Sequence, residues 1–127
     1  MRSLDSSAVI AVIRGEPGAD RVTRHLKGGL LSAVNYAEVV GVLLRHGGTS
    51  EDTRAVLAEL PIRLVPLDEE LAFRTGALEP ATRRAGLSIG DRACLALTQR
   101  HGVPALTSDR MWLEVTRELG IEVELIR

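Results

Sequence analysis

Four acidic residues of this 127-residue sequence stand where carboxylates can act together, namely Asp5, Glu38, Asp91 and Asp109. Asp5 and Asp109 directly follow short stretches that predict strands, and Asp91 lies in the first turn of a predicted helix. Ligands of a parallel sheet bind at the carboxyl ends of its strands, beside the helix starts. Carboxylates that gather there raise one another's pKa or require a cation.

Glu38 differs from the three aspartates because it lies inside a predicted helix. Val34 and Val42 share its face, four residues before and after it, so its carboxylate has almost no polar neighbours along the helix. A buried ionised carboxylate is unfavourable unless a partner compensates its charge. An ion pair with a nearby arginine and membership of an acidic cluster both satisfy this requirement.

Helix capping offers a simpler explanation for the three aspartates. Aspartate is a preferred N-cap, worth about 1 kcal/mol, and Asp5 and Asp109 both stand at expected N-cap positions. Asp91 follows Ser88 by three residues, the spacing of a capping box with aspartate in place of glutamate. For each aspartate taken singly, capping and ligand binding are alternatives.

Taken together, the four carboxylates favour a metal site. Ligands that are all oxygen suit Mg²⁺ or Mn²⁺. A cluster of four can hold two such ions, an arrangement that activates water and stabilises the leaving oxygen in phosphodiester cleavage. The chemistry that these residues predict is therefore metal-assisted hydrolysis of a phosphodiester.

Short strands alternate with helices along the chain, without internal repeats or linkers. This order predicts an α/β fold, an α/β/α sandwich around a central parallel sheet, as one domain over residues 1–127. Strands are predicted at 2–4, 28–34, 62–67, 103–108 and 121–126. Helices are predicted at 5–15, 19–27, 35–46, 50–60, 68–86 with a break near Gly76 and Pro80, 88–102 and 109–120.

Composition narrows the class of protein further. No run of 18 apolar residues occurs, so a cytoplasmic protein without a membrane span is expected. The single cysteine, Cys94, lies in an apolar run, which argues against disulfides and cysteine-rich zinc sites. A net charge of −1 argues against a broad basic surface, yet all of the 16 basic residues except Lys27 are arginines. Because arginine suits bidentate phosphate contacts, a nucleic-acid substrate stays open.

Three segments, in this order along the chain, resemble those of a known family: LDSSAVIAVIRGEPGA at 4–19, SAVNYAEVV at 32–40 and GLSIGDRACLALTQRHGVPALTSDRMW at 86–112. Over essentially its whole length, the sequence resembles PIN-domain ribonucleases of the VapC toxin type. The resemblance implies an Mg²⁺- or Mn²⁺-dependent endoribonuclease with RNA as its substrate. It also implies a cognate VapB-like antitoxin as partner and a homodimer of the toxin.

The resemblance assigns the catalytic and metal-binding roles of the family to Asp5, Glu38, Asp91 and Asp109. A hydroxyl residue near the family's cluster corresponds to Thr107, and Ser7 or Ser6 is a weaker match. One departure concerns the first strand, because Arg2 and Ser3 stand where the family usually has apolar residues. We therefore expect this strand to be short or partly solvated.

Other features outside the acidic set have two readings each. Arg92 and Arg110 each follow an acidic position, so they are candidates for contacts with RNA phosphate or antitoxin, or are solvated or ion-paired. The apolar segments 39–44 and 52–60 predict a dimer or antitoxin surface, with ordinary core packing as the alternative. Trp112 is predicted to lie in the core or at a rim rather than to stack on a base.

The main alternative function is a catalytically weak or inactive PIN-like module that binds protein or RNA. A phosphoryl receiver domain, with Asp68 as its phospho-acceptor, is disfavoured because the only lysine, Lys27, is misplaced for it. A haloacid-dehalogenase-type phosphatase needs an aspartate where Ser7 stands. A dinucleotide-binding fold needs a G-x-G-x-x-G motif after the first strand, and the sequence has none there.

Overall fold

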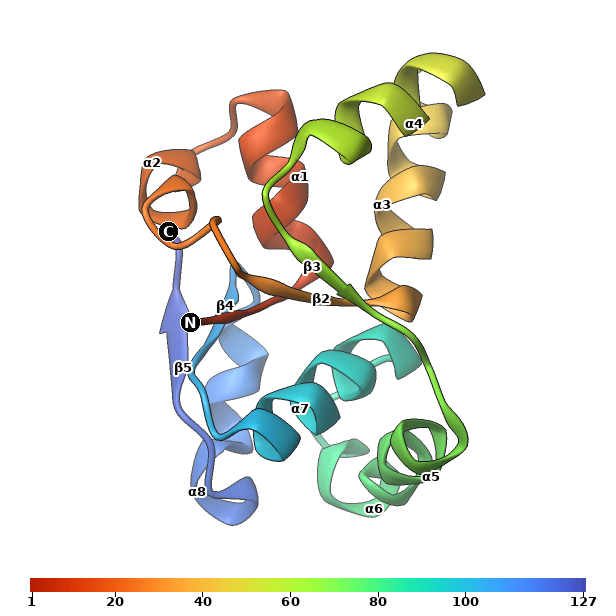
Figure 1. Cartoon of the computed structure of the whole chain (residues 1–127). Helices are drawn as coiled ribbons and strands as arrows, with labels where there is room; N and C mark the ends of the chain where they lie inside the picture. Colours follow the sequence, from red (N-terminus) through yellow and green to blue (C-terminus); the bar gives the residue numbers. More distant parts are fainter.

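The computed structural model describes all of residues 1–127, and a five-stranded parallel sheet forms its centre (Figure 1). The strands are β1 (Ser3–Leu4), β2 (Leu30–Ser32), β3 (Arg63–Val65), β4 (Ala105–Thr107) and β5 (Val123–Leu125). Their order across the sheet is β3-β2-β1-β4-β5, and every neighbouring pair is parallel. The strand order therefore reverses between β1 and β4, where doubly wound sheets bind ligands.

Helices cover both faces of the sheet, as the predicted sandwich requires (Figure 1). One face carries α1 (Ser6–Arg14), α2 (Ala19–Thr23), α3 (Ala33–Arg45) and α4 (Ser50–Glu59). The other carries α5 (Glu69–Ala77), α6 (Glu79–Thr82), α7 (Ile89–His101), the 3₁₀ helix η1 (Arg110–Glu114) and α8 (Thr116–Leu119). None of these helices combines the length and the apolar character that a bilayer crossing needs.

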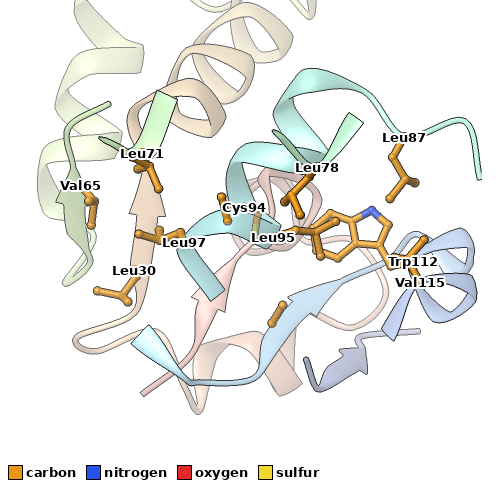
Figure 2. Close-up of a cluster of buried hydrophobic side chains, with 12 residues drawn as sticks. Leu30, Val65, Leu71, Leu78, Leu87, Cys94, Leu95, Leu97, Trp112 and Val115 are labelled. Carbon is orange, nitrogen blue, oxygen red and sulfur yellow. The ribbon is translucent and has the colours of Figure 1, made fainter. Parts of the chain in front are cut away.

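Two hydrophobic clusters lie on opposite faces of the sheet because successive strand residues point in opposite directions. Leu30 faces α7 and its neighbour Leu31 faces α1, and both are fully buried. Figure 2 shows the cluster on the α7 side, where Trp112 lies beside Leu78, Leu95 and Val115. Trp112 is fully buried, which confirms its predicted place in the core.

Local signals set most helix boundaries as predicted. Asp5 and Ser88 cap the starts of α1 and α7, and Gly15 and Gly102 end these helices in the left-handed conformation, at φ of 66° and 62°. The helix predicted over 68–86 breaks at Leu78, because α6 begins afresh with a proline in its first turn.

Several predicted boundaries are wrong. The helix predicted over 19–27 ends earlier, because α2 stops at Thr23. The strand predicted over 28–34 ends at Ser32, whose hydroxyl accepts the backbone N–H of Asn35 and starts α3. The helix predicted over 109–120 divides into η1 and α8 at Val115, where φ is −116°. Trp112 and Val115 are both buried three residues apart, and the three-residue turn of a 3₁₀ helix places both on one face.

The first strand is short, as expected, but it is not solvated. Ser3 and Leu4 are both fully buried. The Ser3 hydroxyl lies 3.4 Å from Cys94 Sγ, and the Nε of Arg2 lies 3.1 Å from Oε1 of Glu124 on β5. The polar side chains that replace apolar residues here therefore have partners, and the strand holds Asp5 firmly.

Candidate active site

Asp5 is the most buried of the four acidic residues, with 4% of its surface exposed. It follows β1 and caps α1, so its Oδ1 accepts the backbone N–H of Ser6 at 2.9 Å. Its Oδ2 accepts the hydroxyl protons of Ser7 and Thr107, each at 2.7 Å. The Ser6 hydroxyl is more distant, at 3.5 Å from Oδ1. Of the three hydroxyl residues named from the sequence, Ser7 and Thr107 therefore make the short contacts with Asp5.

The same two hydroxyls join the end of β1 to the end of β4. The Ser7 hydroxyl accepts the backbone N–H of Ser108, and the Thr107 hydroxyl accepts that of Asp109, each at 3.0 Å. A hydroxyl that donates and accepts at once has one orientation, which fixes both of its partners. The position of Asp5 is thereby tied to the chain segment that carries Asp109.

Asp91 and Asp109 act as helix caps, as the simpler explanation predicted. Asp91 forms a capping box with Ser88, in which its Oδ2 accepts the Ser88 N–H at 2.8 Å. Asp109 Oδ1 accepts the Met111 N–H at 2.9 Å. Both aspartates are half-buried, and the second oxygen of each carboxylate accepts no hydrogen bond from the protein. Capping therefore leaves one oxygen on each residue for a ligand.

Glu38 forms no ion pair with an arginine, so that interpretation is wrong. Its Oε1 instead accepts a hydrogen bond from the side-chain amide of Asn35, at 2.9 Å. The carboxylate packs against Gly90, in the first turn of α7, and a Cβ at this position would overlap both carboxylate oxygens. Glu38 thus reaches from α3 to the helix turn that carries Asp91.

The charges of these residues act on one another. Burial raises the pKa of Asp5 from its ordinary value of 3.8 to about 6, against the hydrogen bonds of Thr107 and Ser7, which lower it. The negative charges of Asp91 and Glu38 are smaller causes of the same rise, and their effect is included in this value. Three of the four predicted acidic residues therefore share one electrostatic environment, while Asp109 joins them through the hydroxyl of Thr107.

The donor set fits a hard divalent cation, although the carboxylates do not form a closed cage. No three histidine, cysteine, aspartate or glutamate side chains converge on one point. The oxygens available at this edge belong to carboxylates, and the pKa of Asp5 is raised mainly by burial and to a smaller extent by the charges of Asp91 and Glu38. Such a set suits Mg²⁺ or Mn²⁺, which bind through one or two carboxylates and keep several waters.

The two arginines beside the acidic positions differ in their surroundings. Arg92 is half-buried and makes no salt bridge, and its Nε is buried without a hydrogen-bond partner. Arg110 is exposed, and its guanidinium donates to the carbonyl of Arg127 at 3.3 Å. Neither side chain contacts a carboxylate of the site.

Three residues that support Glu38 were not predicted from the sequence. They are Ser32, Asn35 and Gly90, and all three are buried. The spacing of the first two is a usable signal, because Ser32, Asn35 and Glu38 recur every three residues and so share one helix face. Gly90 carries no such signal, since its contact with Glu38 joins segments far apart in the sequence.

The helical pair 39–44 and 52–60 is partly buried and partly exposed. Val39 and Leu57 are buried in the core, whereas 38% of Leu44 and 40% of Val56 are exposed. A groove beside this pair is lined mainly by apolar side chains, namely Tyr36, Arg54, Leu57, Ala58, Leu60, Ile62 and Leu64. Part of the predicted surface is therefore ordinary core, and the rest is open to solvent.

A parallel α/β sandwich with carboxylates at the switch point of its sheet defines a class of proteins that bind ligands at this edge. Within this class the chain belongs to the PIN domain family, whose model matches residues 3–118. No curated protein matches the sequence.

Solved structures similar to this chain come from toxin–antitoxin complexes. A DNA-bound VapBC complex of Salmonella typhimurium contains a chain with a TM-score of 0.74 at 18% identity, aligned over 100% of both chains. VapBC2 of Rickettsia felis gives 0.71 at 14% identity over 96% of both chains. A toxin–antitoxin complex of Klebsiella pneumoniae gives 0.68 at 19% identity, over 86% of this chain and 87% of that one. At these identities the similarity concerns the fold.

Proposed function

We propose that this protein is a metal-dependent endoribonuclease, the toxin of a VapC-type toxin–antitoxin pair. The observation that carries the proposal is the placement of Asp5. Its buried carboxylate stands at the switch point of a PIN-family fold, and burial, together with the smaller effect of the charges of Asp91 and Glu38, raises its pKa to about 6. A protein that only needed a helix cap at this position gains nothing from the neighbouring charges, whereas a cation site uses them.

Asp5, Glu38, Asp91 and Asp109 are the residues that would hold Mg²⁺ or Mn²⁺. When bound, such an ion lowers the pKa of a water molecule and stabilises charge on the phosphodiester oxygens. Ser7 and Thr107 keep the carboxylate of Asp5 in one orientation through their hydroxyl protons. Glu38 serves as a further ligand or orients the attacking water. Attack on phosphorus with departure of the 3′ oxygen leaves a 5′-phosphate end.

The arginines beside the site suit contacts with the RNA backbone. Arg92 follows Asp91 directly and is half-buried. Arg110 follows Asp109 and is exposed. Since guanidinium groups bind phosphate in a bidentate manner, these side chains are suited to hold the phosphates that flank the scissile bond.

The fold and an exposed apolar surface both support partner proteins for this chain. Chains with this fold come from VapBC and other toxin–antitoxin complexes. The groove beside α4 and the exposed Leu44 and Val56 offer apolar area to an antitoxin or to a second toxin chain. A VapB-like antitoxin and a homodimer are the partners that we propose for this surface.

Calorimetric titration of Mn²⁺ into wild type and Asp91→Asn tests the site directly. Asparagine preserves the cap, because its side-chain oxygen still accepts the Ser88 N–H, but removes the charge. We expect binding to wild type and loss of binding in the variant, with circular dichroism showing that both are folded. Asp5→Asn and Asp91→Asn are then expected to abolish Mn²⁺-dependent cleavage of total RNA.

One observation favours a second candidate, a PIN-like module that binds protein or RNA without catalysis. No three ligating side chains converge, and each aspartate of the set already serves as a helix cap. A folded wild type that binds no Mn²⁺, or a folded Asp91→Asn that cleaves RNA at the wild-type rate, would count against the nuclease site as assigned. The first result would favour the binding module.

A further inference from the structure

Asn35 is a fully buried polar side chain whose hydrogen bonds are all satisfied. Its amide oxygen accepts the Ser32 hydroxyl proton at 2.6 Å. Its amide nitrogen donates one proton to Glu38 Oε1 at 2.9 Å and the other to the carbonyl of Gly90 at 3.0 Å. Because the last two groups only accept, the amide has one possible orientation. Asn35 therefore connects the end of β2, α3 and the start of α7.

Starting the helix does not require this side chain. Ser32 is the N-cap of α3, and it accepts the backbone N–H of Asn35, a bond that any residue except proline could make. The amide nitrogen of Asn35 instead donates to two other partners, one of which is the carboxylate of Glu38. An apolar residue would fill the same volume without a buried amide to satisfy. These partners indicate that the side chain of Asn35 serves to hold the carboxylate of Glu38.

Gly90 completes the arrangement from the opposite side. Its carbonyl accepts from Asn35, and the space where a side chain would begin is occupied by the Glu38 carboxylate. Gly90 does not have a positive φ, so space rather than backbone conformation requires a glycine here. The carboxylate is therefore held between an amide donor and the backbone of α7, next in sequence to Asp91.

We propose that Asn35 is a positioning residue, which fixes the Glu38 carboxylate against the first turn of α7 so that Glu38 and Asp91 act on the same cation. This inference rests on the metal site proposed above. Asn35 itself touches neither the cation nor the RNA. Groups that orient metal ligands in this way typically change metal affinity by about 10- to 100-fold when they are removed.

A double-mutant cycle on Mn²⁺ affinity separates positioning from general structural support. Asn35→Ala is expected to weaken Mn²⁺ binding about tenfold or more in the wild-type background. In a Glu38→Ala background the same substitution is expected to have no further effect, because no carboxylate remains to be positioned. Equal losses in both backgrounds, or no loss in the wild-type background, would overturn the proposal. Urea unfolding of every variant records stability alongside affinity.

Gly90→Ala provides a second route to the same displacement if Asn35→Ala does not fold. The added Cβ displaces the Glu38 carboxylate while the Asn35 side chain stays in place, so weaker Mn²⁺ binding is expected here too. Gly41→Ala, on the same helix as Glu38 and with open space around its Cβ, is the matched control and should leave Mn²⁺ affinity unchanged. Unchanged affinity in Gly90→Ala would also overturn the proposal.

A second control matches the burial of Asn35. Thr75→Ala removes a buried hydroxyl that donates to the Leu71 carbonyl on α5, a helix that carries none of the four acidic residues, and should lower stability without changing Mn²⁺ affinity. The failure of the positioning role is distinguishable from the failure of the metal site. If Asp91→Asn abolishes Mn²⁺ binding while Asn35→Ala does not change it, only the positioning role fails. If wild type binds no Mn²⁺, the site itself fails.

Discussion

Neutralising Asp5 should make the metal-free protein less sensitive to pH, and the structure gives the size of the effect. The pKa of Asp5 is about 6 in the folded protein, against an ordinary value of 3.8. Since one pH unit of difference in pKa corresponds to about 1.4 kcal/mol, ionised Asp5 lowers the free energy of unfolding by about 3 kcal/mol at high pH.

The direction follows from which state binds more protons. Between the two pKa values the folded protein keeps the Asp5 proton and the unfolded chain has lost it, so stability falls as pH rises. The contribution of Asp5 is fully favourable below pH 3.8 and is lost as the pH rises through about 6. About 2 kcal/mol of the change falls between pH 4 and pH 7.5.

Asp5→Asn removes this dependence because asparagine does not titrate. The difference in unfolding free energy, wild type minus variant, should decrease by about 2 kcal/mol from pH 4 to pH 7.5. The substitution also alters the hydrogen bonds to Ser7 and Thr107. This alters the size of the difference in unfolding free energy at any one pH, but it has little effect on how that difference changes with pH. Urea unfolding in EDTA measures it, and fluorescence of the buried Trp112, the sole tryptophan, reports the transition.

Asp20→Asn is the matched control, because Asp20 is an exposed carboxylate on α2 without a side-chain hydrogen bond. Its difference from wild type should change little across the same pH range. A flat or rising difference for Asp5→Asn would refute the reasoning, since it would mean that the fold does not disfavour the ionised form of Asp5.

Three further predictions concern the metal, the hydroxyls and a helix end. Mn²⁺ at 100 times its Kd should raise the unfolding free energy of wild type by about 2.7 kcal/mol, measured by urea unfolding and reversed by EDTA; an unchanged midpoint would argue against binding. Thr107→Val removes a hydrogen bond that lowers the pKa of Asp5, so calorimetry should find Mn²⁺ binding shifted to higher pH; an unshifted profile would contradict this role. Gly102→Ala should destabilise the protein by about 1 kcal/mol in thermal unfolding, because the φ of Gly102 is 62°. Gly76→Ala, in the last turn of α5 and without a positive φ, should not destabilise it.

Helix starts and ends were predictable from the sequence because capping is local. The Asp5, Ser88 and Gly102 signals each act within one helical turn, and the structure has the corresponding helix ends. The boundary between β2 and α3 was misplaced because residues 28–34 form an apolar run without periodicity, so only the Ser32 cap marks the helix start. The split of the last helical segment depends on Trp112 and Val115 entering the same cluster, which is a tertiary requirement.

The sequence by itself determined the candidate acidic residues and the α/β class, since both follow from residue types, their order and their spacing. Only the tertiary structure decided which of these residues act on one another. Burial of Asp5 between the ends of β1 and β4 sets its pKa, and the packing of Glu38 on Gly90 joins α3 to α7. These contacts join residues far apart in the chain, and no local pattern specifies them, because the strand order of the sheet alone brings them together.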